Sequence, residues 1–156
     1  MITRTLLTIV SKVALQPLYR QTRGLTLGTR TAVFDSENRV LLVRHSYGPG
    51  WFLPGGGVER RETIFHSAMR EVREEAGIIA EEEPVLKGIC LNDGQFPGDH
   101  VAVLTLRRFS RDAWKPGLEI RQAEFFTVDL LPEGTSGGTR RRLEEIISNR
   151  DIARHW

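Results

Sequence analysis

The stretch that decides the fold is GGVERRETIFHSAMREVREEAGI, residues 56–78. Its second half predicts a helix over 63–76, because Thr63 is a suitable N-cap and Gly77 suits the position after the last turn. The apolar side chains of that helix form one stripe, and they are Ile64, Phe65, Ala68, Met69, Val72 and Ala76. We expect this stripe to face the core of a domain.

Three glutamate residues, Glu71, Glu74 and Glu75, flank the apolar stripe. Carboxylates spaced three and four residues apart on a helix repel one another, so a bound cation is the simplest explanation for the cluster. Carboxylate oxygens favour Mg²⁺ or Mn²⁺ over zinc, and the four histidine residues show no spacing typical of metal ligands. Arg70 lies one turn before Glu74 and is placed to hold a carboxylate in position.

The residues around the helix distinguish this cluster from an ordinary solvated face. The run Pro54–Gly57 supplies backbone that can approach a ligand closely, Glu62 precedes the helix, and Gly77-Ile78 follows it. The complete pattern is G-x5-E-x7-R-E-U-x-E-E-x-G-U, where U is an aliphatic residue. It resembles the Nudix box at every fixed position, and the wider resemblance covers roughly residues 25–147.

This resemblance implies an α/β fold, a Nudix-type α/β/α sandwich with a mixed sheet, in residues 24–156. It also implies Mg²⁺-dependent hydrolysis of a nucleoside diphosphate derivative, which releases a nucleoside monophosphate and a second phosphorylated product. Mn²⁺ is expected to substitute for Mg²⁺. The positions that match the family's metal ligands are the carbonyl of Gly55 and the side chains of Glu71, Glu74 and Glu75. Those matching its bracing residues are Arg70 and Glu62.

The chemistry needs a base that takes a proton from the attacking water. Glu74 is our first candidate, and the other two helical glutamate residues are alternatives. Some family members use a glutamate from a later loop, for which Glu119 and Glu124 are the candidates here. Similar sequences often carry a second acid where this chain has Gln122, and this departure favours a base inside the box.

Substrate contacts are less well marked in the sequence. Arg44 is a candidate phosphate ligand, and Trp51 and Phe96 are candidates for stacking on a base. The alternative for each is an ordinary place on a strand face or in the core. The run Arg140–Arg142 lacks interleaved aromatic residues, so nucleic acid is not an expected partner. Two further functions stay open, namely a nucleotide-sensing module without hydrolysis and a pyrophosphohydrolase acting on RNA 5′ ends.

The rest of the chain predicts a mixture of strands and helices. Segments 25–34 and 39–45 are expected to form a hairpin through the turn at 35–38. Further strands are expected at 84–91, 100–109 and 123–130, and a last helix is expected to start near Thr139.

Composition limits the remaining choices. A chain of 156 residues with 40% hydrophobic and 27% charged residues suits one globular domain. The single cysteine, Cys90, excludes an internal disulfide and fits the cytoplasm. Residues 1–34 hold five basic side chains and no acid, so the remainder has 17 basic against 20 acidic residues. Residues 1–23 predict an amphipathic helix that packs on its own domain or in a homodimer. A peripheral membrane contact and an acid-poor targeting sequence are the less favoured alternatives.

Overall fold

The computed structural model describes residues 24–94 and 96–156. The helix expected within residues 1–23, with its homodimer and membrane alternatives, lies outside these residues. The elements are β1 (Thr26–Val33), β2 (Arg39–His45), α3 (Ile64–Ala76), β3 (Ile78–Ala80), β4 (Val85–Leu91), β5 (Asp99–Leu106), β6 (Phe109–Arg111), β7 (Ile120–Thr127), the 3-10 helix η2 (Val128–Leu130) and α4 (Gly137–Ile147). No helix of the described part is long and apolar enough to cross a membrane.

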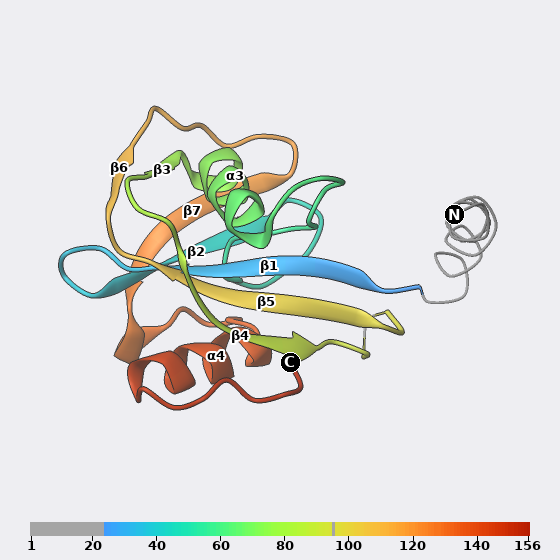
Figure 1. Ribbon diagram of the computed structural model, residues 1–156. Coiled ribbons are helices and arrows are strands. Elements are labelled where there is room, and N and C mark those ends of the chain that lie inside the picture. The colour runs from blue at the N-terminus through green and yellow to red at the C-terminus, as the bar shows by residue number, and fades with distance from the viewer. Residues whose placement is uncertain (1–23, 95) are drawn as a thin grey trace, which may run out of the picture.

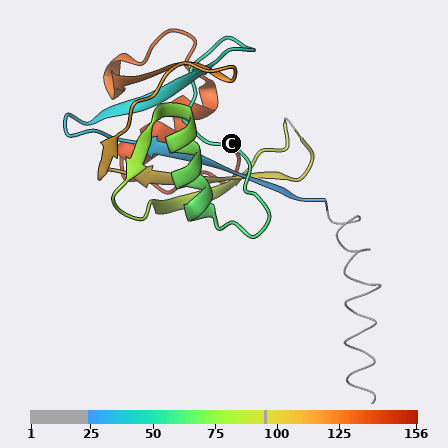
Figure 2. The ribbon, with the colours of Figure 1, turned by 90° about the horizontal axis from the view of Figure 1, so that it is seen from above.

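The strands form a layered structure with one helix on each side (Figure 1). The largest sheet has the order β1-β5-β4, in which β1 and β5 run parallel while β4 is antiparallel to β5. Two-stranded antiparallel sheets pair β2 with β7 and β3 with β6. Seen from above, α3 lies in front of the strands and α4 behind them (Figure 2). The predicted α/β/α sandwich with a mixed sheet is confirmed.

The predicted hairpin of β1 and β2 forms only at its turn, and the prediction that the two strands pair along their length is wrong. The turn itself forms, because the Asn38 N–H donates to the carbonyl oxygen of Asp35 at 3.0 Å. The two strands then meet only at an isolated bridge between Phe34 and Val40. β1 pairs along its whole length with β5, and β2 pairs with β7. Both strands bury residues on two faces, and such strands need long-range partners rather than a solvated hairpin.

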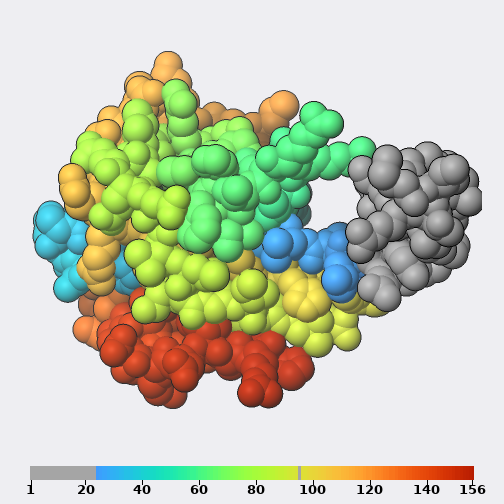
Figure 3. Space-filling view, viewed as in Figure 1, coloured from blue at the N-terminus to red at the C-terminus, as the bar shows by residue number. Residues whose placement is uncertain are grey.

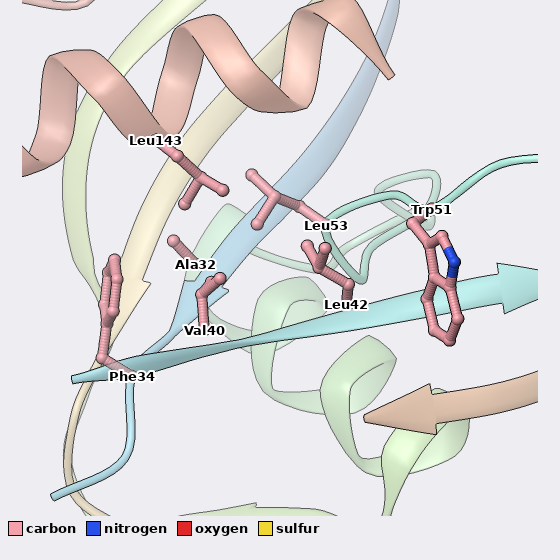
Figure 4. Close-up of a cluster of buried hydrophobic side chains, with 7 residues drawn as sticks. All are labelled: Ala32, Phe34, Val40, Leu42, Trp51, Leu53 and Leu143. Atoms are coloured by element: carbon pink, nitrogen blue, oxygen red, sulfur yellow. The ribbon is translucent and has the colours of Figure 1, made fainter. Parts of the chain in front are cut away.

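The core consists of three buried clusters, one under α4 and two under α3. On the α4 side, Leu143 packs towards Ala32 of β1 and Val40 and Leu42 of β2 (Figure 4). On the α3 side, Val72 and Ala76 pack against a cluster that contains Val33, Leu41, Ile78 and Leu106. Successive residues of β1 and β2 therefore point to opposite layers. This alternation explains why their sequences are almost continuously apolar.

The helix limits follow from local capping. The Thr63 Oγ1 accepts a hydrogen bond of 3.1 Å from the His66 N–H, and Gly77 ends α3 in the left-handed region at φ 65°. The helix expected over 63–76 is thus confirmed. The second helix begins at Gly137, two residues before the predicted Thr139, because Ser136 is its N-cap and accepts from the Thr139 N–H.

The C-terminal segment lies beside β4, because the Leu91 N–H donates to the Arg154 carbonyl and the Trp156 N–H donates to the Leu91 carbonyl. In the space-filling view, α4 and the residues after it (red) form one layer beneath β4 (Figure 3). The Arg142 side chain is fully buried here, and it donates to Glu145, to the Cys90 Sγ and to the carbonyl oxygen of His155. Arg142 is therefore not part of a basic surface, whereas Arg140 and Arg141 are exposed.

Candidate active site

The glycine loop after β2 is attached to β1. The Thr29 N–H donates to the Gly56 carbonyl at 2.8 Å, and the Thr31 N–H donates to the Pro54 carbonyl at 2.9 Å. Gly55 has φ 145°, and a Cβ there would overlap the Thr29 carbonyl. Only glycine fits this conformation so close to a neighbouring strand. The loop thus has a fixed position beside the C-terminal half of α3.

Two box glutamates approach this loop closely. Glu75 is 6% exposed, and its Oε2 accepts a hydrogen bond of 2.9 Å from the Gly55 N–H. A Cβ on Gly56 would lie 2.5 Å from the Glu71 Oε1, so a larger residue would displace that carboxylate. The backbone of the glycine loop therefore lies close to the carboxylates of Glu71 and Glu75.

Arg70 connects the helix with the residues before it. Its Nε and Nη2 donate to the two carboxylate oxygens of Glu62 at 2.9 and 3.0 Å. The Nη1 donates to the Glu71 Oε1 at 2.7 Å and lies 3.4 Å from the Glu74 Oε2. The Nη2 also donates to the Gly57 carbonyl at 3.0 Å. One guanidinium thereby positions the loop, the helix and the Glu71 carboxylate together.

Burial and charge set the protonation of these acids in different directions. Burial raises the pKa of Glu75 to about 7, against the opposing effects of the Gly55 N–H and of Arg30. Burial also raises the pKa of Glu71, against the hydrogen bond from Arg70. The hydrogen bonds from Arg70 lower the pKa of Glu62 to about 2. The Glu62 carboxylate is therefore ionised at neutral pH, whereas the charges of Glu71 and Glu75 are only partly compensated by neighbouring groups.

The tertiary structure brings His45 and Glu119 close to one helical glutamate, Glu75. One ligand atom from each of His45, Glu75 and Glu119 lies within 4.8 Å of the others. His45 ends β2 at an irregularity in its pairing with β7, and the Ser46 N–H donates to the Glu119 carbonyl at 2.9 Å. Glu119 was expected as one alternative for a later acid. His45 was not predicted as a site residue. It lies 30 positions before Glu75 and 74 positions before Glu119, so no local spacing connects it with either.

The other predicted site residues take different places. Glu74 is exposed on α3, beside a shallow hollow that Met69, Arg70 and Arg73 also line. Glu124 accepts a hydrogen bond of 3.3 Å from Gln122, which in turn accepts one of 3.3 Å from Arg44.

Two predicted aromatic contacts are not assembled with this cluster. Trp51 is 8% exposed and packs edge-on against Phe126 in the core, and its expected role in stacking on substrate stays a prediction. Phe96 is 67% exposed on the loop between β4 and β5, where its carbonyl accepts from the Asp99 N–H. Beside His45 the structure instead places Tyr47 and Phe52, with ring centroids 4.9 and 5.5 Å from the imidazole.

The donor set fits a divalent cation. Within the described residues, the Glu71 Oε2 and the Glu75 Oε1 accept no hydrogen bond, although the other oxygen of each carboxylate does. Two free carboxylate oxygens at the border of a buried loop are suited to Mg²⁺ or Mn²⁺. The Gly55 carbonyl, also expected as a ligand, accepts a hydrogen bond from the Arg30 Nη1. A cation at that oxygen would have to share it with a guanidinium.

Comparisons with known proteins show the family to which this chain belongs. The NUDIX domain family model matches residues 24–145. An ADP-ribose pyrophosphatase of Methanocaldococcus jannaschii is 31% identical over 65% of this chain and 62% of the relative. Diphosphoinositol polyphosphate phosphohydrolase 2 of Rattus norvegicus is 39% identical over 61% of this chain and 53% of the relative. The matched part therefore spans less than two thirds of either relative.

A solved structure shows the same fold. The MutT NUDIX hydrolase of Burkholderia pseudomallei superposes with a TM-score of 0.66 and 26% identity, over 78% of this chain and 97% of that one. The family model covers most of the chain, so the protein belongs to the NUDIX domain family.

Proposed function

We propose that this protein hydrolyses the pyrophosphate bond of a nucleoside diphosphate derivative with the help of Mg²⁺. The products would be a nucleoside monophosphate and a second phosphorylated compound. The observation that carries the proposal is the pair of free carboxylate oxygens, on Glu71 and Glu75, held against the glycine loop. The name of the M. jannaschii relative, an ADP-ribose pyrophosphatase, supports the same reaction class.

The chain's own residues would divide the work. Glu71, Glu74 and Glu75 would hold divalent cations, with the Gly55 carbonyl as a further oxygen ligand. A bound divalent ion withdraws charge from the pyrophosphate oxygens and lowers the pKa of water. Arg70 and Glu62 would act as positioning residues. The Arg70 guanidinium donates to the Glu71 carboxylate, and Glu62 holds that guanidinium in place.

Glu74 is our first choice for the general base that accepts the proton of the attacking water. It is the most exposed of the three glutamates on α3 and so meets solvent directly. Glu71 and Glu75 are competing assignments, and Glu119 is the candidate from outside the box. Arg44, which lies on β2 beside Gln122, would contact a substrate phosphate, and the exposed Phe96 ring would stack on a base. The free thiol of Cys90 supports a cytoplasmic place of action.

A substrate panel tests the proposal. Purified protein is incubated with nucleoside diphosphate sugars, dinucleotides, nucleoside triphosphates, a diphosphoinositol polyphosphate and 5′-triphosphorylated RNA, with Mg²⁺ or Mn²⁺, and products are identified by mass. We expect a nucleoside monophosphate from at least one nucleotide derivative. Failure of the whole panel, with nucleotide binding intact, would instead support a sensing module.

The base assignment is tested separately on the best substrate. Glu74→Gln is expected to lower kcat by about 10²- to 10⁴-fold, the range for losing a general base. The matched control is Glu83→Gln, on the exposed turn after β3. If Glu74→Gln keeps a rate within a few-fold of the wild type, the base is one of the competing residues.

A further inference from the structure

We propose that His45 supplies a nitrogen ligand to a divalent cation held together with Glu75 and Glu119, and that this position therefore prefers Mn²⁺ to Mg²⁺. The inference rests on the proposed function only in treating Glu75 as a metal ligand. Its other two members lie outside the box, on β2 and in the segment just before β7.

The first observation is the convergence of three ligand types from distant parts of the chain. One atom from each of His45, Glu75 and Glu119 lies within 4.8 Å of the other two. Ligands bound to one ion at about 2.1 Å are separated by roughly 3 to 4 Å. Side-chain rotations that move the ligand atoms by about an ångström would thus bring all three to one cation.

The second observation concerns the unused capacity of these side chains. The Nδ1 of His45 is buried and has no hydrogen-bond partner among the described residues. A buried nitrogen without a hydrogen-bond partner costs free energy in the folded state. A cation bound by the imidazole would remove this cost, either by binding that nitrogen or by reorienting the ring. The Glu75 Oε2 is bound to the Gly55 N–H, which leaves the Oε1 of the same carboxylate for a cation.

The third observation is that the ligands are held by the fold. The imidazole stacks on Tyr47 with an interplanar angle of 26°, and Phe52 lies at 55° to it. Glu119 is fixed through its backbone, because its carbonyl accepts from the Ser46 N–H next to His45. A site on strand ends and a buried helix position is ordered before the ion arrives, which reduces the entropic cost of binding.

The ligand chemistry determines which ion is preferred. Mg²⁺ requires near-ideal octahedral oxygen coordination and keeps several waters. Mn²⁺ also binds carboxylate oxygens, but as a first-row transition metal it accepts an imidazole nitrogen more readily than Mg²⁺ does. One nitrogen and two carboxylates form a mixed set that Mn²⁺ accepts readily. The all-oxygen set of Glu71 and Glu74 carries no such nitrogen, so the two parts of the acidic cluster would differ in metal preference.

The test uses Mn²⁺ itself as the probe, on the full chain and without substrate. Electron spin echo envelope modulation of bound Mn²⁺ should show ¹⁴N coupling from an imidazole in the wild type. The coupling should be replaced by a ¹⁵N pattern in protein labelled with ¹⁵N-histidine. This measurement needs no variant, and absence of histidine coupling in the wild type overturns the proposal.

Two variants then locate the nitrogen. His45→Gln should abolish the coupling and weaken Mn²⁺ by about tenfold or more, while Mg²⁺ affinity in a competition titration changes by less than about threefold. His66→Gln, on the exposed face of α3, is the matched control and should leave coupling and affinity unchanged. Coupling that persists in His45→Gln overturns the assignment. Because no step depends on hydrolysis, failure of the substrate panel and failure of this inference are distinguishable.

Discussion

The backbone N–H of Gly55 donates a hydrogen bond of 2.9 Å to the Oε2 of Glu75, a side chain that is 6% exposed. This contact connects the glycine loop to the last turn of α3 and takes up one oxygen of a buried carboxylate. The other oxygen stays available for a cation. A single hydrogen bond therefore both fixes the loop and orients a candidate ligand.

Glu75 should destabilise the metal-free protein at neutral pH. Its folded-state pKa is about 7, above the ordinary 4.5, so the folded state binds more protons between these values. Its contribution to stability therefore falls as pH rises from 4.5 through 7. In EDTA, Glu75→Gln should be more stable than the wild type at pH 8, by on the order of 1–3 kcal/mol. Urea unfolding should show this difference vanish near pH 4.5, and lower stability of the variant at pH 8 would contradict it.

Glu62 should have the opposite pH dependence. The hydrogen bonds from Arg70 lower its pKa from 4.5 to about 2, so its stabilising contribution is present above pH 4.5 and is lost as pH falls towards 2. Glu62→Gln should therefore cost about 1–2 kcal/mol at pH 7 and almost nothing at pH 2, by thermal or urea unfolding. Glu59→Gln, on the same exposed turn, is the matched control. A loss that does not depend on pH would exclude this ion pair as its cause.

The glycine loop offers a matched pair of substitutions for the site. Gly56→Ala places a Cβ 2.5 Å from the Glu71 Oε1, whereas a Cβ on Gly57 meets nothing within 4 Å. Gly56→Ala should therefore displace the Glu71 carboxylate and weaken Mg²⁺ or Mn²⁺ binding by about tenfold or more. Gly57→Ala should bind either ion as the wild type does. Calorimetric titration of both variants decides the matter, and equal affinities would show that Glu71 moves aside freely.

Arg70→Lys separates charge from geometry. Lysine keeps the positive charge but lacks the planar fork that contacts Glu62, Glu71 and the Gly57 carbonyl together. We expect a loss of about 1–3 kcal/mol in the free energy of unfolding and a lower kcat on the best substrate of the panel. If Arg70→Lys matches the wild type in both measurements, charge alone explains the role of Arg70.

The start of α4 gives a second glycine pair, far from the candidate site. A Cβ on Gly138 would overlap the Trp156 indole, whereas one on Gly137 meets only the end of the Arg141 side chain, at 3.3 Å. Gly138→Ala should cost about 1–3 kcal/mol through overpacking. Gly137→Ala should be neutral or stabilising, because alanine favours the helix. Thermal unfolding of the two variants, together with Trp fluorescence, checks whether the C-terminal segment depends on this contact.

The sequence by itself determined α3 and the identity of its acids. Thr63 and Gly77 cap the helix through bonds to residues within five positions, and the apolar stripe has a period that depends only on helix geometry. Fold class followed from the box, since every fixed position of the motif is present. These features are local, so a short window of sequence contains the physics that produces them.

Only the tertiary structure decided which distant residues meet. Apolar runs at β1 and β2 indicate strands but not partners, because pairing with β5 and β7 depends on burying two faces at once. The sequence likewise did not show that Trp51 would be buried in the core. His45 and Glu119 join Glu75 through strand ends that no local pattern connects. The box specifies an acidic helix, while the packing of the strands around it determines which side chains complete the site.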